Sequence, residues 1–311
     1  MRPPPAILLI GPTASGKTAL ALELATRLPC DIISIDSAQV FRDMNIGTAK
    51  PDASTLARFP HRLIDLITPE QRYSAAQFRA DALREMATIA AAGRIPLLVG
   101  GTMLYVKALR EGLADLPPAD PALRARIDAE AAEHGWPALH AELARLDPQT
   151  GARLKPTDAQ RIQRALEVVR LSGRTLGSFF ATQINDRLPY RCLTLALVPG
   201  DRGELHRRIA RRFEAMLDAG LIDEVVTLRH RYRLDAGLPS MRCVGYRQVW
   251  QVLEGQLPPR DLRERGVFAT RQFAKRQLTW LKSLRDLRAI DPLEADPAAR
   301  LLAAADAHLS Q

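Results

Sequence analysis

The residues with the clearest chemistry form the segment Gly11-Pro12-Thr13-Ala14-Ser15-Gly16-Lys17-Thr18, which matches the phosphate-binding pattern G-x-x-x-x-G-K-[ST]. It follows the apolar run Ala6–Ile10 and precedes a helical pattern, which is the context this loop requires. Glycines let backbone N–H groups turn toward phosphate oxygens, while the helix N-terminus and Lys17 supply positive charge. The Thr18 hydroxyl is suited to ligate Mg²⁺. The pattern predicts a site for phosphate or diphosphate, as in nucleotide- and ATP-binding proteins, without specifying a nucleoside triphosphate.

Two other strand ends carry polar groups. In P-loop nucleotidases a second strand usually ends in an Asp that holds Mg²⁺, but here Pro96–Val99 runs into Gly100-Gly101-Thr102. Either another acid holds the metal, or the phosphates belong to a leaving group. Asp36 ends the apolar run Asp31–Ile35, and a carboxylate there can act as a general base. The alternative for Asp36 is a turn or helix cap.

The elements around these residues alternate between strand and helix. Strands are expected at 6–10, 31–35, 96–99 and 191–198, and helices at 17–28 and 74–92, the second with Ser74 as N-cap. This order predicts an α/β fold, a P-loop NTPase-like parallel sheet flanked by helices. Gly11, Asp36 and Gly100 then lie at neighbouring carboxyl ends of strands, where ligands bind. The stretch 45–60 is polar and is expected to be rich in turns.

A helical insertion interrupts this core. Residues 1–115 and 188–311 are expected to form the catalytic core with basic C-terminal helices, at 202–219, 221–232 and 259–284. Residues 116–187 form the insertion, with helices expected at 120–134, 137–146 and 157–171. Gln160 and Arg164 are four residues apart and share a face. Arg and Gln suit base edges and phosphates, but the residues of this helix by themselves favour an exposed, solvated face.

Composition narrows the class of protein. The 311 residues include 44 Lys and Arg against 35 Asp and Glu, a net charge of +9 that suits a polyanionic partner. Three Cys without metal-ligand spacing argue against a disulfide framework or a zinc site. No apolar run approaches the roughly 18 residues of a membrane span. We therefore expect a cytoplasmic protein that does not enter a membrane.

Eight segments together carry a resemblance to one family. They are, in order, Ile10–Thr18, Asp36–Phe41, Gly47–Pro51, Val99–Tyr105, Asp158–Arg161, Met216–Leu221, Val244–Gln248 and Lys275–Trp280. Between about Ile7 and Arg285 the chain closely resembles the bacterial tRNA dimethylallyltransferases, also called tRNA isopentenyltransferases. Phe41 stands where many members carry Tyr.

The resemblance implies a reaction and the residues that carry it. The family transfers a dimethylallyl group from its diphosphate to N6 of adenosine-37, 3′ to the anticodon, in tRNAs that read codons beginning with U. The P-loop then holds a leaving group, and no second-strand Asp is needed. Asp36 is implied as the base, with Thr102 and Lys17 as further catalytic residues. Gly11–Thr18 and Arg212 are implied to bind the diphosphate with Mg²⁺.

The resemblance also implies where the anticodon stem-loop of tRNA binds. The expected contacts are Asp36, Ser37, Ala38, Gln39, Thr102, Arg124, Gln160, Arg161, Ile162, Gln163, Arg164, Cys243, Val244, Gly245, Tyr246, Arg247, Gln248, Lys275, Arg276, Gln277, Leu278, Thr279, Trp280, Leu281 and Lys282. Such a protein is expected to act as a monomer.

Three other functions are compatible with parts of this pattern. A small-molecule kinase would use the P-loop for ATP, but would not need the basic charge or the insertion. A prenyl transferase for free adenine nucleotides would share Asp36 and the P-loop without needing the 160–164 helix. A non-enzymatic RNA-binding protein would tolerate Asp36→Ala.

Overall fold

The computed structural model describes residues 2–181 and 188–310. The chain divides into two compact units, one formed by residues 1–110 with 188–311 and the other by residues 111–187. Each unit has an apolar core of its own. The sequence analysis expected the insertion to begin at residue 116, and the second unit begins at residue 111.

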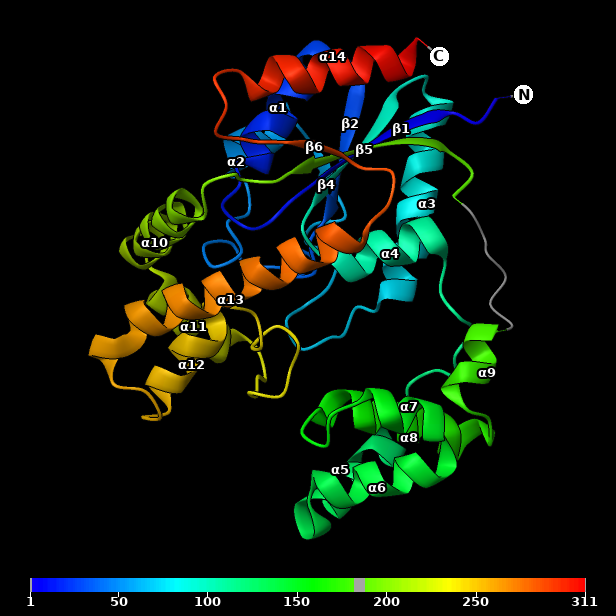
Figure 1. Ribbon diagram of the computed structural model, residues 1–311. Coiled ribbons are helices and arrows are strands. Elements are labelled where there is room, and N and C mark those ends of the chain that lie inside the picture. Colours follow the sequence, from blue (N-terminus) through cyan, green and yellow to red (C-terminus); the bar gives the residue numbers. More distant parts are fainter. Residues whose placement is uncertain (1, 182–187, 311) are drawn as a thin grey trace. The chain divides into compact units, whose positions relative to one another are not determined.

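A six-stranded parallel sheet forms the centre of the first unit (Figure 1). Its strands are β1 (Pro5–Ile10), β2 (Cys30–Ile35), β3 (His61–Arg62), β4 (Ile95–Gly100), β5 (Arg191–Leu197) and β6 (Arg288–Ile290), in the order β3-β2-β4-β1-β5-β6. The central strands are buried on both faces, which explains why they are continuous apolar runs. The predicted α/β class with a parallel sheet is confirmed.

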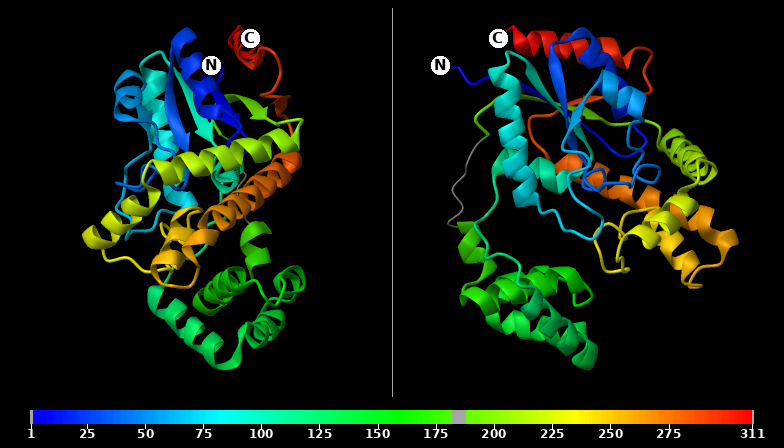
Figure 2. Two further views of the ribbon diagram at one scale, coloured as in Figure 1. Left: turned by 90° about the vertical axis from the view of Figure 1, so that its left-hand side faces the viewer. Right: turned by 180° about the vertical axis from the view of Figure 1, so that it is seen from behind.

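Helices cover both faces of this sheet (Figure 2). On one face lie α3 (Ala75–Ala91) and α4 (Met103–Glu111), and on the other α1 (Lys17–Arg27) and α14 (Pro297–Leu309). The predicted start of α3 is confirmed, because Ser74 and Gln77 form a reciprocal capping box. The chain after Leu284, which the sequence left unassigned, forms β6 and α14.

A group of helices adds a second apolar core to the same unit. It comprises α10 (Arg202–Asp218), α11 (Leu221–Arg231), α12 (Tyr246–Leu253), the 3₁₀ helix η1 (Pro259–Asp261) and α13 (Leu262–Ser283). Val40, Phe41 and Met44, which follow β2, pack into this core. The stretch 45–60, expected to be rich in turns, also includes the short helix α2 (Ala53–Arg58), which follows its N-cap Asp52. The segment after β2 is therefore held by the helices of the C-terminal half.

The second unit is helical. Its elements are α5 (Pro121–His134), α6 (Trp136–Leu146), α7 (Pro148–Arg153), α8 (Ala159–Ser172) and α9 (Leu176–Ala181). Ile127, Leu143, Ile162 and Leu166 meet in its core. Helix α8 ends at Gly173, whose φ of 66° is the left-handed conformation that favours glycine at a helix C-terminus.

In the part of the chain that the structure describes, no helix combines the length and the apolar character needed to cross a membrane.

Candidate active site

Three loops meet at the carboxyl ends of adjacent strands. Strands β2, β4 and β1 are neighbours, and they are followed by Asp36, Gly101 and Gly11 respectively. The Thr102 amide donates to the Ile35 carbonyl (3.2 Å), and the Thr102 hydroxyl accepts from the Ser37 amide (3.0 Å). The loops that follow β2 and β4 are therefore joined by hydrogen bonds, as the parallel sheet predicts.

The P-loop has the backbone of an anion site. Ala14 and Gly16 have φ values of 62° and 87°, so the chain turns sharply before α1 begins at Lys17. The Ser15 hydroxyl is buried and has no hydrogen-bond partner among the described residues. An unpaired buried hydroxyl is costly, and a phosphate oxygen would satisfy it. The N-terminus of α1 adds its dipole at the same place.

Two cations stand beside this loop, the partly buried Lys17 and the more exposed Arg212, and both line the smaller cavity at the strand ends. The Lys17 ammonium donates to the Pro12 carbonyl (2.6 Å). Burial, and next the nearby Arg212, lower the pKa of Lys17 to about 7, and Asp36 opposes this shift. The surrounding protein also lowers the pKa of Arg212, and the Asp36 charge opposes this shift. Two neighbouring cations that repel each other favour a bound anion between them.

Arg212 differs from the other arginines of α10. Arg207, Arg208 and Arg211 all form ion pairs with Glu204 at the helix surface. Arg212 instead lines the cavity at the strand ends. Of these four arginines, Arg212 alone is placed to contact a ligand there.

Asp36 uses one carboxylate oxygen to shape its own loop. Its Oδ1 accepts from the amides of Ala38 (2.8 Å) and Gln39 (3.4 Å), so the turn-cap interpretation is correct for this oxygen. Among the described residues, Oδ2 of Asp36 has no hydrogen-bond partner. Asp36 also lines the cavity. One oxygen can therefore fix the loop while the other accepts a proton.

Two cavities share Asp36 as a wall. The larger, of about 360 Å³, has an apolar side formed by Ile209, Phe213, Met216 and Phe273 of α10 and α13. The smaller, of about 80 Å³, lies at Lys17 and Thr18. An apolar chamber next to an anion site fits a molecule that carries a hydrocarbon group on a diphosphate.

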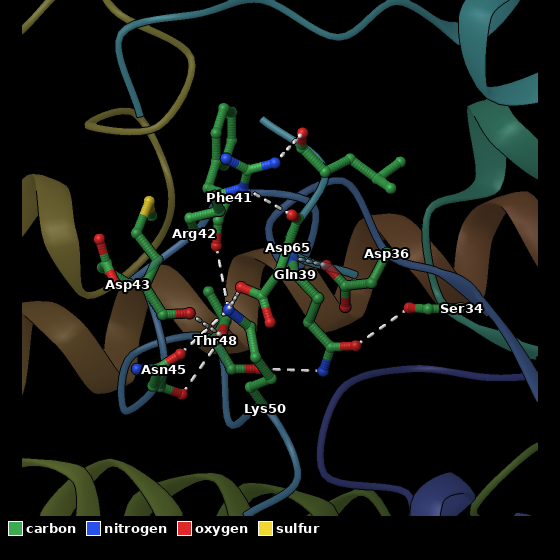
Figure 3. A network of polar contacts seen from close by, with 12 residues as sticks. Ser34, Asp36, Gln39, Phe41, Arg42, Asp43, Asn45, Thr48, Lys50 and Asp65 are labelled. Atoms are coloured by element: carbon green, nitrogen blue, oxygen red, sulfur yellow. Dashed lines mark hydrogen bonds and ion pairs between the residues drawn. The ribbon is translucent and has the colours of Figure 1, made fainter. Parts of the chain in front are cut away.

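A polar network holds the segment that follows Asp36 (Figure 3). Gln39 accepts from the Ser34 hydroxyl (3.0 Å) and donates to the Thr48 carbonyl (3.5 Å). The Lys50 ammonium donates to the Phe41 carbonyl (3.0 Å) and to the Asn45 side chain (3.0 Å). These contacts close the loop between residues 36 and 50 into one ordered structure.

Helix α11 holds the same segment from outside. The Glu224 carboxylate accepts from the amides of Asn45 (2.9 Å), Ile46 (2.7 Å) and Gly47 (3.3 Å). It also accepts from the hydroxyl of Tyr246, whose ring is fully buried. A Cβ on residue 47 would lie 2.5 Å from that ring, so only glycine fits. The Gly47–Pro51 segment is thus packed tightly against the C-terminal helices.

Comparisons with known proteins identify the family to which the chain belongs. A family model described as IPP transferase matches residues 39–284, and another described as isopentenyl transferase matches residues 5–67. The chain belongs to the IPP transferase family. It is 60% identical over 309 residues to the tRNA dimethylallyltransferase of Dechloromonas aromatica, covering 99% of this chain and 98% of that one. It is also 60% identical over 306 residues to the tRNA dimethylallyltransferase of Thiobacillus denitrificans, covering 98% and 97%.

Solved structures of IPP transferases share the fold. The tRNA isopentenylpyrophosphate transferase of Bacillus halodurans superposes with a TM-score of 0.71 at 33% identity, covering 99% of this chain and 97% of that one. A eukaryotic dimethylallyltransferase, described as acting on tRNA, gives a TM-score of 0.81 at 24% identity, covering 96% and 77%. The P-loop NTPase-like architecture predicted from the sequence is confirmed.

In the insertion, two arginines that were expected to bind RNA form ion pairs within the protein. Arg124 and Arg164 both pair with Glu167, which is fully buried (2.8 and 2.6 Å). Ile162 is buried in the core of the unit, and Gln163 donates to Asp128 (2.6 Å). The exposed side chains of the expected RNA-binding group are Gln160 and Arg161.

The other two expected RNA-binding segments also divide into buried and exposed parts. Cys243 and Val244 line the larger cavity, and burial, with a smaller effect of Asp36, raises the pKa of the Cys243 thiol to about 12. Gly245 is the N-cap of α12, and its amide donates to the Gln248 side chain (2.8 Å). Buried positions are Tyr246, Gln248, Gln277 and Leu281, with Leu278 partly buried; exposed positions are Arg247, Lys275, Arg276, Thr279, Trp280 and Lys282. The exposed members are the ones whose side chains can reach RNA.

Several lining residues had no local signal in the sequence. His61 borders the smaller cavity, and burial lowers its pKa. Ile209 and Phe213 are four apart on α10, and that spacing predicts an apolar helix face without showing that it borders a cavity. Phe273 reaches the same cavity from α13.

Proposed function

We propose that this chain transfers a dimethylallyl group from dimethylallyl diphosphate to N6 of adenosine-37, 3′ to the anticodon, in tRNAs that read codons beginning with U. One observation supports this most strongly. The Asp36 carboxylate borders both the small cavity at Lys17 and Thr18 and the larger, partly apolar cavity. A base between an anion site and a hydrocarbon site suits transfer of an allyl group. The names of the relatives support tRNA as the acceptor.

The chemistry follows from these positions. The adenine N6 forms a bond to the terminal allyl carbon while the bond from that carbon to the diphosphate oxygen breaks. Negative charge grows on the departing oxygen, where Lys17, Arg212 and the P-loop amides stabilise it. The amine proton passes to Asp36, the carboxylate that lines both cavities. Diphosphate and prenylated tRNA are the products.

Mg²⁺ fits the donor atoms at this site. The Thr18 hydroxyl lines the small cavity beside Lys17, and Mg²⁺ prefers oxygen ligands of this kind. Among the described residues no cluster of three or more His, Cys, Asp or Glu offers an all-protein metal site. Mg²⁺ commonly takes one or two protein ligands together with substrate phosphates. We propose that Thr18 helps to hold Mg²⁺, which neutralises charge on the diphosphate.

The acceptor base must leave its stack to reach Asp36, which is cheapest in a loop such as the anticodon loop. In the proposal Thr102, which lines the larger cavity, contacts the flipped adenosine. Exposed cations such as Arg161 and Lys275 bind the stem-loop backbone. A monomer in the cytoplasm is sufficient for this reaction.

The test is mass spectrometry of nucleosides from unmodified tRNA incubated with the protein, Mg²⁺ and dimethylallyl diphosphate. We expect N6-dimethylallyl adenosine with the native chain. With Asp36→Asn the rate should fall about 10²- to 10⁴-fold, because the amide keeps an oxygen for the Ala38 amide but accepts no proton. Binding of tRNA should persist. Prenylation of free AMP but not tRNA, or consumption of ATP with a metabolite, would support the alternative functions instead.

A further inference from the structure

A buried amide from α13 lies between the two loops that the proposed reaction uses. The side chain of Gln277 is only 4% exposed. Its Oε1 accepts from the Thr13 amide (2.8 Å), and its Nε2 donates to the Gly101 carbonyl (2.8 Å). One end of the amide therefore holds the P-loop, and the other holds the turn between β4 and α4.

The contact between Gln277 and Gly101 leaves no room for a side chain at residue 101. A Cβ on residue 101 would lie 2.4 Å from Nε2 of Gln277 and 2.9 Å from the Gly11 carbonyl oxygen. The P-loop, the Gly101 turn and the Gln277 amide are thus in van der Waals contact. Because the next residue, Thr102, lines the larger cavity, a shift of Gly101 would move the wall on which the acceptor base would lie.

The contact also defines which P-loop amides are available. A backbone N–H carries one hydrogen, and that of Thr13 is directed at Gln277. The diphosphate must then be held by amides later in the loop and by Lys17. Gln277 thereby gives the start of the loop one conformation before the anion binds.

We propose that Gln277 is a positioning residue, which fixes the P-loop and the Gly101–Thr102 turn relative to each other so that leaving group and acceptor are aligned. The inference builds on the proposed function and assigns Gln277 a different part from its exposed neighbours on α13. Both ends of its amide are engaged within the protein. Alignment matters because a displacement of about 1 Å can cost about 10²-fold in rate.

The first experiment compares Gln277→Met with Gln272→Met. Both replacements exchange an amide for a thioether of similar size on the same helix, but the side chain of Gln272 lies outside both cavities. For Gln277→Met we expect a fall in kcat of about 10- to 100-fold, with a dissociation constant for tRNA within about twofold of native. For Gln272→Met we expect native values. Unchanged kcat with weakened tRNA binding in Gln277→Met would make Gln277 an RNA contact and overturn the proposal.

A second variant remains informative if Gln277→Met does not fold. In Gln277→Glu the protonated carboxyl reproduces the amide, with one oxygen accepting from Thr13 and the hydroxyl donating to Gly101. The ionised form cannot donate and places negative charge against the Gly101 carbonyl. We therefore expect the activity of Gln277→Glu, divided by native activity at the same pH, to rise severalfold as pH falls from 8 to 5.5. The ratio cancels the pH effects that the two proteins share. A flat ratio would overturn the proposal.

A binding measurement separates this inference from the proposed function. Calorimetric titration with inorganic diphosphate and Mg²⁺ reports on the P-loop whether or not any tRNA is prenylated. We expect Gln277→Met to weaken this binding by about tenfold, while Gln272→Met leaves it unchanged. If native protein prenylates no tRNA but this difference persists, the reaction is wrong and the positioning role stands. If native protein prenylates tRNA and the difference is absent, the positioning role is wrong.

Discussion

The ammonium group of Lys50 lies 2.5 Å from Oδ1 of Asp65, and the Lys50 side chain is only 3% exposed. The same ammonium group donates to the Phe41 carbonyl and the Asn45 side chain. Asp65 in turn donates its amide to the Gln39 carbonyl (3.0 Å). Lys50 thus links the loop of residues 36–50 to Asp65, as Figure 3 shows.

Replacing Lys50 should disturb this segment without touching a substrate. Asp43, Ala49 and Asp65 all have positive φ values, a conformation that persists only where surroundings impose it. We expect Lys50→Met to lower the free energy of unfolding by about 2 kcal/mol, since its hydrogen bonds to carbonyl and carboxylate are lost. The turnover should fall at least tenfold. Urea unfolding and steady-state kinetics measure both effects, and native kinetics in a destabilised variant would remove Lys50 from the positioning of Asp36.

Diphosphate binding should depend on the titration of Lys17. The pKa of Lys17 is lowered to about 7, chiefly by burial and then by Arg212, so the free enzyme loses this charge as pH rises through 7. A bound anion stabilises the ammonium form and raises its pKa. Affinity for diphosphate should therefore fall as pH rises from 7 to 9, with a proton taken up on binding. Calorimetry in two buffers measures that uptake, and Lys17→Met should lack the part that comes from Lys17.

The same shift sets the sign of a stability effect. The unfolded chain binds more protons than the folded one between pH 7 and the ordinary pKa of 10.5. Burying Lys17 therefore costs stability most fully below pH 7, and the cost disappears as pH rises toward 10.5. Relative to Lys17→Met, the native chain should gain stability across that window. A constant difference between the two unfolding curves would contradict the lowered pKa.

Two arginines of α8 should respond differently to removal. Arg164 pairs with the fully buried Glu167, which keeps Arg124 as a second partner, so Arg164→Ala should destabilise the chain by about 2 kcal/mol. Arg161 is 73% exposed and pairs with Asp158 at the surface. Arg161→Ala should leave stability within about 0.5 kcal/mol and lower the salt slope of tRNA binding by about 1. An unchanged slope would show that Arg161 does not contact phosphate.

The apolar wall should limit the length of the allyl chain. Met216 lines the larger cavity and is only partly buried, so its removal should cost less stability than that of Phe213. We expect Met216→Ala to increase kcat/KM for geranyl diphosphate relative to dimethylallyl diphosphate by about 10-fold, because a few methylenes are worth about 1–3 kcal/mol in such a pocket. Competition between both diphosphates with mass-spectrometric detection measures the ratio. A decrease would place the hydrocarbon elsewhere.

Local sequence patterns predicted much of the framework. The P-loop, the N-cap Ser74 and the β-branched strand β2 depend on interactions within a few residues, so their patterns are readable. Helix α14 was not predicted from its Ala-rich stretch, and its place in the fold is defined by packing on α1. The short strand β6 has three residues and depends on pairing with β5.

By itself the sequence determined the α/β class, the anion-binding loop and the carboxylate at the end of β2, because each is encoded in contiguous residues. Only the tertiary structure placed Arg164 against Glu167 and put Gln277 between two loops. Gln277 and Thr13 are 264 residues apart in the chain, and no periodicity encodes such a contact. The direction of a side chain on an amphipathic helix depends on what packs against that helix, and this is decided when distant segments fold together.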